Sequence, residues 1–290
     1  EYLSNIALQS YTVMGLVDWP FILQYKNTTP YIYHIIEQGR WTIGWPLTIF
    51  MYAGTMVLGK QVISRFPLKK TGYDVAQRLV LLIWVLIYFM LIGGLYVKYP
   101  RYMLPIIPIQ IIFAAILLVR ILKISVTYGL PVVLVVVSTT AVYAIEYVRM
   151  YEQPHPWIVA SNWMYRNVDI GDTVLIEKWD HPLPMPQVRQ LDKLVFKEGF
   201  DTVAMNLAEL PDTEQKFTPI VEDIVQADYI IVASNRNYGP VYGNSELFPY
   251  SVKYYQGLFD GTLGYSLALA ETRHPSFSGI SLRGDPIGSA

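Results

Sequence analysis

Four long segments without a charged residue dominate the first half of this 290-residue chain. They are 19, 19, 18 and 22 residues long and cover residues 41–59, 79–97, 102–119 and 124–145. At a rise of about 1.5 Å per residue, a helix of that length nearly crosses a hydrocarbon core about 30 Å thick. Four such segments in succession are improbable inside a soluble protein. The sequence therefore predicts a bundle of four transmembrane helices over residues 41–150.

The charges divide the chain into two halves of opposite sign. Residues 1–150 hold 12 Lys and Arg against 5 Asp and Glu, whereas residues 151–290 hold 10 against 18, so the net charge of −1 conceals a basic and an acidic half. This division indicates two environments. With 53% hydrophobic and 16% charged residues, the chain is neither one soluble domain nor disordered. No basic stripe of a nucleic-acid-binding module is present, so no nucleic-acid partner is expected.

The basic residues between the uncharged segments predict an orientation. The connection over residues 60–78 carries five Lys or Arg against Asp74, and the connection over residues 120–123 carries Arg120 and Lys123. Both belong on the cytoplasmic side by the positive-inside rule. An even number of spans then places both ends of the chain on the outer side. The sequence predicts a multi-pass protein of the cytoplasmic (plasma) membrane whose C-terminal domain is extracytoplasmic.

The two flanking regions differ in character. Residues 1–40 are expected to form an extracytoplasmic loop with an interfacial helix over Tyr31–Gln38. Residues 151–290 alternate between strand and helix patterns, which favours a small extracytoplasmic α/β domain with a largely parallel sheet and a long loop over residues 235–244. The expected strands are Thr173–Glu177, Val203–Asn206, Tyr229–Ser234 and Tyr265–Glu271, and the expected helices are Trp157–Asn167, Pro219–Gln226 and Pro249–Phe259.

One short connection departs from the charge rule. Lys98 and Arg101 lie between the second and third spans, on the predicted outer side, with no acidic residue in the connection. Helix-end cations of this kind can reach out to lipid headgroups. Alternatively, the point charge of a lysine and the planar fork of an arginine together suit a phosphate or pyrophosphate group. Both interpretations are compatible with the sequence.

The remaining titratable residues give weaker signals. Asp180-His181 precedes a proline-rich turn, so it is either a turn cap or half of a metal or acid–base pair. His34, His155 and His274 are isolated in the sequence, and each is expected on the surface. The chain contains no Gly-rich phosphate loop, no GxSxG and no HExxH motif. The sequence therefore predicts no metal site within this chain.

The connection that carries Lys98 also resembles a known family. Lys98-Tyr99-Pro100-Arg101-Tyr102-Met103-Leu104-Pro105, followed by Pro108, resembles a stretch of the bacterial membrane glycosyltransferases of the protein O-mannosyltransferase and aminoarabinose transferase group, in the GT-C superfamily. Further similar stretches are Asp18-Trp19-Pro20, Trp45-Pro46, Trp179-Asp180-His181-Pro182, Ser234-Asn235-Arg236-Asn237 and Tyr254-Tyr255-Gln256-Gly257. The resemblance touches most of the chain.

The resemblance implies the C-terminal part of an enzyme that transfers a sugar from a polyprenyl-phosphate donor to an acceptor glycolipid or protein at the outer face of the membrane. Lys98, Arg101 and Tyr102 would then hold the donor phosphate. Asp18 and Glu37 lie on the predicted outer side, where either is a cavity-facing acid or a solvated loop carboxylate. The family's essential acidic residue in the first outer loop has no match here. A divalent metal, if the full-length protein uses one, would have its ligands outside this chain.

A non-enzymatic alternative follows from the same comparison. Because the catalytic acidic loop has no counterpart, the chain is alternatively an accessory or scaffolding subunit of a larger membrane complex with a transferase-like body. A transporter is less favoured, since the four uncharged segments hold none of the ionisable groups that transport pathways place at membrane depth. Membrane lipids are expected partners under every interpretation.

Overall fold

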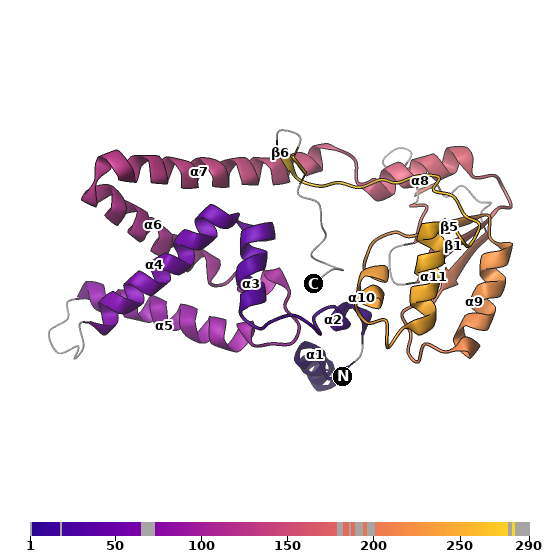
Figure 1. The fold of residues 1–290 in the computed structure, drawn as a ribbon, viewed down its shortest axis with the longest axis horizontal. Coiled ribbons are helices and arrows are strands. Elements are labelled where there is room, and N and C mark those ends of the chain that lie inside the picture. Colours follow the sequence, from indigo (N-terminus) through magenta and orange to yellow (C-terminus); the bar gives the residue numbers. More distant parts are fainter. Residues whose placement is uncertain are drawn as a thin grey trace. The chain divides into compact units, whose positions relative to one another are not determined.

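The computed structural model of this chain describes residues 2–17, 19–64, 73–178, 182–185, 187–188, 194–195, 201–277 and 280–281. It divides into two compact units (Figure 1). The first comprises Glu1–Leu16 and Tyr25–Val148, and the second comprises Val17–Gln24 and Arg149–Ala290. Each unit has its own architecture, and each is described separately below.

The first unit is helical throughout its described part. Prolines stand at the first turns of α4, α6 and the short turn η3, where the missing N–H costs no hydrogen bond. The elements in chain order are α1 (Tyr2–Met14), α3 (Ile32–Glu37), the π-turn η1 (Gln38–Thr42), α4 (Trp45–Ile63), α5 (Tyr73–Gly93), the 3₁₀ turn η3 (Pro100–Met103), α6 (Ile107–Ile124) and α7 (Val126–Arg149). α3 confirms the helix expected near Tyr31–Gln38.

Three helical segments of the described chain are long and apolar enough to cross a membrane. They are Val75–Gly93 in α5, Ile107–Ile124 in α6, and a run that begins with α7 at Val126. The predicted count of four is not confirmed, because α4 is not among them. Residues 41–44 of the first uncharged segment lie outside α4, and the helix instead continues through Lys60 and Gln61, which lowers its apolar content.

A glycine allows α4 and α6 to pack closely. A methyl group added at Gly54 would lie 2.4 Å from the carbonyl oxygen of Phe113, so only a residue without a side chain fits there. α5 joins the same core through Leu82 and Val85. The buried side chains of this core are Met51, Leu58, Val62, Leu82, Val85, Met103, Ile106, Ile107, Phe113 and Ala114.

The second unit is built on a three-stranded parallel sheet. The strands are β1 (Thr173–Glu177), β4 (Asp201–Met205) and β5 (Tyr229–Ile231), in the order β4-β1-β5. This confirms the predicted parallel arrangement. The helices are α2 (Pro20–Leu23), α8 (Pro156–Asn167), α9 (Glu214–Gln226), α10 (Tyr238–Gly243) and α11 (Pro249–Asp260), and the small antiparallel pairs are β2 (Gln187–Val188) with β3 (Leu194–Val195) and β6 (Ser276–Phe277) with β7 (Ile280–Ser281).

The two faces of this sheet are covered by different helices. Successive strand residues point to opposite faces, and accordingly Val174 packs in one cluster with Met164 of α8, whereas Leu175 packs in another with Phe217 of α9 and Tyr255 of α11. The sheet is therefore a middle layer between α8 on one face and α9 with α11 on the other.

Two expectations for this unit were wrong. Residues 265–271 form no strand, although they were expected to; they line an open groove of about 2130 Å³ in the second unit together with β5, and the hydroxyl of Tyr265 bonds to the carbonyl oxygens of Ile224 and Ala227. Residues 235–244 are not a continuous loop, since α10 occupies most of them. Asn244 closes that helix by donating to the carbonyl oxygens of Pro240 and Leu23.

Candidate functional site

The connection between α5 and α6 in the first unit carries the two cations that the sequence singled out. Tyr99 has the extended backbone that a following proline favours, and Pro100 then begins η3. η3 contacts α3, which carries Glu37. The short connection and α3 therefore bring residues from two distant parts of the sequence together.

Lys98 points into the protein. Its residue is only 2% exposed, and its Nζ donates to the carbonyl oxygen of Tyr96 at 2.9 Å. The ammonium group also lies 5.6 Å from the ring centre of Tyr96 and 5.9 Å from that of Tyr25. Burial lowers the pKa of Lys98, because the charged form loses its hydration. This placement differs from that of a helix-end lysine that reaches out to lipid headgroups.

Arg101 is exposed and lies against aromatic rings. The central carbon of its guanidinium is 4.3 Å from the ring centre of Tyr99 and 5.9 Å from that of Tyr102. Tyr102 is half-buried, and its carbonyl oxygen accepts a hydrogen bond from the hydroxyl of Tyr88 at 2.8 Å. An exposed guanidinium has N–H groups available for two hydrogen bonds to the oxygens of a phosphate.

A pair of tyrosine rings connects the two cations. The rings of Tyr25 and Tyr99 meet edge to face with their centres 5.9 Å apart. Lys98 lies near Tyr25 and Arg101 lies over Tyr99. The structure thus places the two predicted cations at the same aromatic pair, one buried and one exposed.

Several buried polar side chains of α3 lie beside the Tyr25–Tyr99 pair. The ring of Tyr33 meets that of Tyr25 at 5.7 Å and that of His34 at 5.9 Å. His34 is fully buried, which corrects the expectation that it lies on the surface, and Glu37 is also buried. We refer to Tyr25, Tyr33, His34 and Glu37 as the buried polar cluster.

Five polar atoms of the buried polar cluster have no hydrogen-bond partner within the described part of the chain. They are the hydroxyl oxygens of Tyr25 and Tyr33, both ring nitrogens of His34, and Oε2 of Glu37. Most buried polar atoms in folded proteins are hydrogen-bonded. A concentration of unpartnered atoms in one place is a mark of a functional site.

Burial sets the charge state of the buried polar cluster. Loss of hydration lowers the pKa of His34 to about 4, and the nearby charge of Lys98 adds to the shift, so the imidazole is neutral at pH 7. Loss of hydration also raises the pKa of Glu37, while the charge of Arg40 opposes this rise. The pKa values of Tyr25 and Tyr33 are raised chiefly by burial as well. Every group here is shifted toward its neutral form.

The other predicted residues are placed as follows. Glu37 lies in the buried polar cluster, whereas Asp18 and the pair Asp180-His181 lie outside the described residues. Across the described ranges, no three His, Asp or Glu side chains come together as metal ligands would, and the divalent metal stays a prediction. Sequence reasoning missed Tyr25, Tyr33 and His34 because isolated aromatic residues carry no spacing signal of their own.

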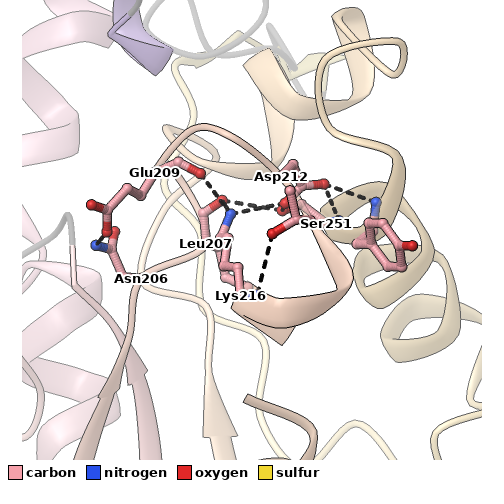
Figure 2. Close-up of polar contacts among 8 residues, drawn as sticks. Asn206, Leu207, Glu209, Asp212, Lys216 and Ser251 are labelled. Atoms are coloured by element: carbon pink, nitrogen blue, oxygen red, sulfur yellow. Dashed lines mark hydrogen bonds and ion pairs between the residues drawn. The ribbon is translucent and has the colours of Figure 1, made fainter. Parts of the chain in front are cut away.

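The second unit holds a different kind of polar cluster, around Asp212 (Figure 2). Oδ2 of Asp212 accepts hydrogen bonds from the backbone N–H groups of Tyr250 and Ser251, at the start of α11. Oδ1 accepts from Nζ of Lys216 at 2.8 Å and from the hydroxyl of Ser251 at 2.9 Å. Lys216 donates in addition to the carbonyl oxygens of Leu207 and Glu209. Because both carboxylate oxygens have donors, this cluster is structural: it fastens α9 and the segment before it to α11.

Glu177 forms a similar buried anchor at the end of β1. Its Oε1 accepts a hydrogen bond from the hydroxyl of Tyr255, and its Oε2 accepts one from the side-chain amide of Asn237, both at 2.9 Å. These bonds connect the sheet to α11 and to the segment before α10. The carboxylate is therefore held by two partners, in contrast to Glu37 of the first unit.

Comparisons of this chain with protein-family models, with curated proteins and with solved structures found no match.

Proposed function

We propose that this chain is the C-terminal part of an integral-membrane glycosyltransferase, which moves a sugar from a polyprenyl-phosphate donor to a glycolipid or protein acceptor at the outer face of the membrane. One observation carries the proposal: Lys98 and Arg101 lie at the same tyrosine pair, in the short connection between two helices apolar enough to span a membrane. A lipid-linked phosphate would lie at this depth.

The two cations would act on the donor phosphate in different ways. Arg101 lies over the ring of Tyr99 and is exposed, so its N–H groups would be available to bind the phosphate oxygens through two hydrogen bonds. Lys98 contributes a buried positive charge, whose effect is larger in a medium of low dielectric constant than in water. Negative charge grows on the leaving phosphate during sugar transfer, and preorganised cations stabilise that charge.

The proposed topology accompanies this function. α4 would be a fourth span, with Lys60 at its cytoplasmic end, and the second unit would be extracytoplasmic. The connection between α5 and α6 would then face the outer side, where a polyprenyl-phosphate sugar is used.

A binding experiment tests the proposal. The chain is placed in lipid nanodiscs, and its affinity for undecaprenyl phosphate is compared with that of Arg101→Ala and Lys98→Met. Loss of charge-assisted hydrogen bonds predicts a decrease of about 10- to 100-fold for Arg101→Ala. Arg120→Ala is the matched control, because Arg120 is an exposed cation of α6. Equal affinity in wild type and Arg101→Ala overturns the phosphate role.

An accessory subunit is the second candidate, because the residues that resemble the family include no counterpart of its catalytic acidic loop. Transfer assays with the full-length protein distinguish the two candidates. Donor binding without transfer of sugar, together with stable co-purification of other membrane proteins, would favour the accessory role.

A further inference from the structure

The buried polar cluster requires both hydrogen-bond donors and hydrogen-bond acceptors from a ligand. The hydroxyls of Tyr25 and Tyr33 can donate, and a neutral His34 donates from one ring nitrogen and accepts at the other. Oε2 of Glu37 accepts when the carboxyl is ionised and can donate when it is protonated. A phosphate oxygen only accepts, so it would leave the acceptor nitrogen of a neutral His34 without a partner. A group rich in hydroxyls satisfies both kinds of atom, because each hydroxyl donates and accepts.

The rings around these atoms favour a compact ring rather than a chain. The ring of Tyr25 meets the rings of Tyr33 and Tyr99 edge to face, so aromatic surface lies beside the polar atoms. Sugar rings present C–H groups that carry slight positive charge, and aromatic faces carry slight negative charge.

The backbone beside the cluster is strained. Tyr31 has φ +63, which a residue with a side chain rarely adopts, and it separates the largely exposed residues 26–30 from α3. Its backbone N–H donates to the carbonyl oxygen of Gly93. The unpartnered atoms of the cluster are closed off from solvent in this structure, so entry of a ligand requires a local rearrangement of the protein around them.

We propose that Tyr25, Tyr33, His34 and Glu37 form the binding site for the sugar ring, and that the sugar is neutral and rich in hydroxyls. This inference rests on the proposed function, because it places the sugar of the donor on the buried side of the Tyr25–Tyr99 pair and the phosphate on the side of Arg101.

The test compares a carrier with and without its sugar. Undecaprenyl phosphate alone and undecaprenyl phosphate that carries mannose, glucose, galactose or arabinose are titrated against the chain in nanodiscs. We expect at least one of the four loaded carriers to bind about tenfold more tightly than the bare carrier, the equivalent of one well-made hydrogen bond. Tyr25→Phe and Tyr33→Phe remove one hydroxyl each, and both are expected to abolish this gain. Affinity for the bare carrier is expected to stay unchanged in Tyr33→Phe, because among the described residues neither Lys98 nor Arg101 lies over the ring of Tyr33.

The outcomes separate the two proposals. Tyr11→Phe is the matched control, since Tyr11 is exposed on α1 and its variant should keep the full gain. If all four loaded carriers bind like the bare carrier, the sugar site is overturned and the phosphate site stands. If a loaded carrier binds and the bare one does not, the sugar site stands and the phosphate site is overturned. If no carrier binds, both are overturned. Thermal unfolding of each variant confirms that it is folded.

Discussion

The hydroxyl groups of Tyr25 and Tyr33 are buried at a cost, because neither has a partner among the residues that the structure describes. We therefore expect Tyr25→Phe and Tyr33→Phe to stabilise the ligand-free chain by about 1 kcal/mol each, since each removes an unpartnered polar group and keeps the ring. Thermal unfolding in detergent measures the effect.

A third tyrosine provides the control for this prediction. The hydroxyl of Tyr88 donates to the carbonyl oxygen of Tyr102, so Tyr88→Phe should destabilise the chain by about 1 kcal/mol. Destabilisation by all three substitutions would contradict the view that Tyr25 and Tyr33 are unpartnered in the empty protein. A variant that gains stability in the ligand-free state but loses affinity for the sugar would identify a tyrosine hydroxyl that serves binding and not folding.

Asp212 predicts a dependence of stability on pH. Burial by itself raises the pKa of Asp212, but hydrogen bonds from Lys216 and Ser251 outweigh it, and the pKa of the carboxyl lies below its ordinary value. The folded state therefore gains stability above the unfolded pKa of about 3.9 and loses it as the pH falls through the folded pKa. We expect α11 in the whole chain to lose protection from hydrogen exchange below about pH 4.

The substitution Asp212→Asn isolates this contribution. An amide has one oxygen in place of two, so the variant leaves Lys216 or the N–H groups at the start of α11 without an acceptor. We expect a loss of about 2–4 kcal/mol in protection of α11 at pH 7, and no further loss from titration at this site on acidification. Acid sensitivity of α11 equal to that of the wild type would contradict the assignment. Glu222→Gln is the control, because Glu222 is exposed on α9.

At the scale of elements, the close packing of α4 on α6 depends on one position. Gly54→Val places side-chain atoms against the backbone of Phe113, which can relieve the clash only if a helix shifts. We expect a loss of about 2 kcal/mol or more in unfolding experiments. Gly59→Ala in the same helix is the control, because its added methyl group would meet Leu82 at an ordinary 3.8 Å and should be neutral or slightly stabilising. Equal effects of the two substitutions would contradict this packing.

Local sequence patterns predicted some elements closely and others poorly. The strand Thr173–Glu177 and the helices α8 and α11 agree with the predicted bounds within one residue, because each is a short amphipathic or apolar segment bounded by a proline or a polar turn. Residues 265–271 have a strand-like composition but make no ladder hydrogen bonds, and pairing of a strand depends on a neighbour that no local pattern specifies.

The candidate site divides in the same way. Lys98 and Arg101 could be selected from the sequence because their charge contradicts the positive-inside rule. Tyr25 and His34 could not, because only the folded chain brings them near Lys98: the ring of Tyr25 lies beside its ammonium group, and α3, which carries His34, contacts η3. That contact is a property of the fold.

At the scale of the whole molecule, the orientation in the membrane can be tested because the chain has no cysteine. Single cysteines at Tyr2, Ser64 and Tyr151 provide exposed reporters in α1, after α4 and after α7. We expect a membrane-impermeant maleimide added to intact cells to label Tyr2→Cys and Tyr151→Cys and not Ser64→Cys. Permeabilised cells, in which all three should react, are the control.

The pattern of labelling also decides the number of spans. If α4 crosses the membrane, Tyr2→Cys and Ser64→Cys lie on opposite sides; labelling of both from one side limits the chain to three spans. Labelling of Ser64→Cys alone in intact cells would reverse the proposed orientation and place the second unit in the cytoplasm.

The N-terminal helix has a consequence for any attempt to transfer the Lys98 connection to another protein. The backbone N–H of Val97 donates to the carbonyl oxygen of Val13, and Gly15, with φ +73, lies where a methyl group would be 2.5 Å from the ring of Tyr96. Tyr96 in turn supplies the carbonyl oxygen that holds Lys98. A graft of residues 94–106 onto a foreign helix pair would transfer Lys98 without the contacts of Val13 and Gly15 that position Tyr96 and Val97. The smallest unit that could be transplanted therefore includes residues 2–16 as well.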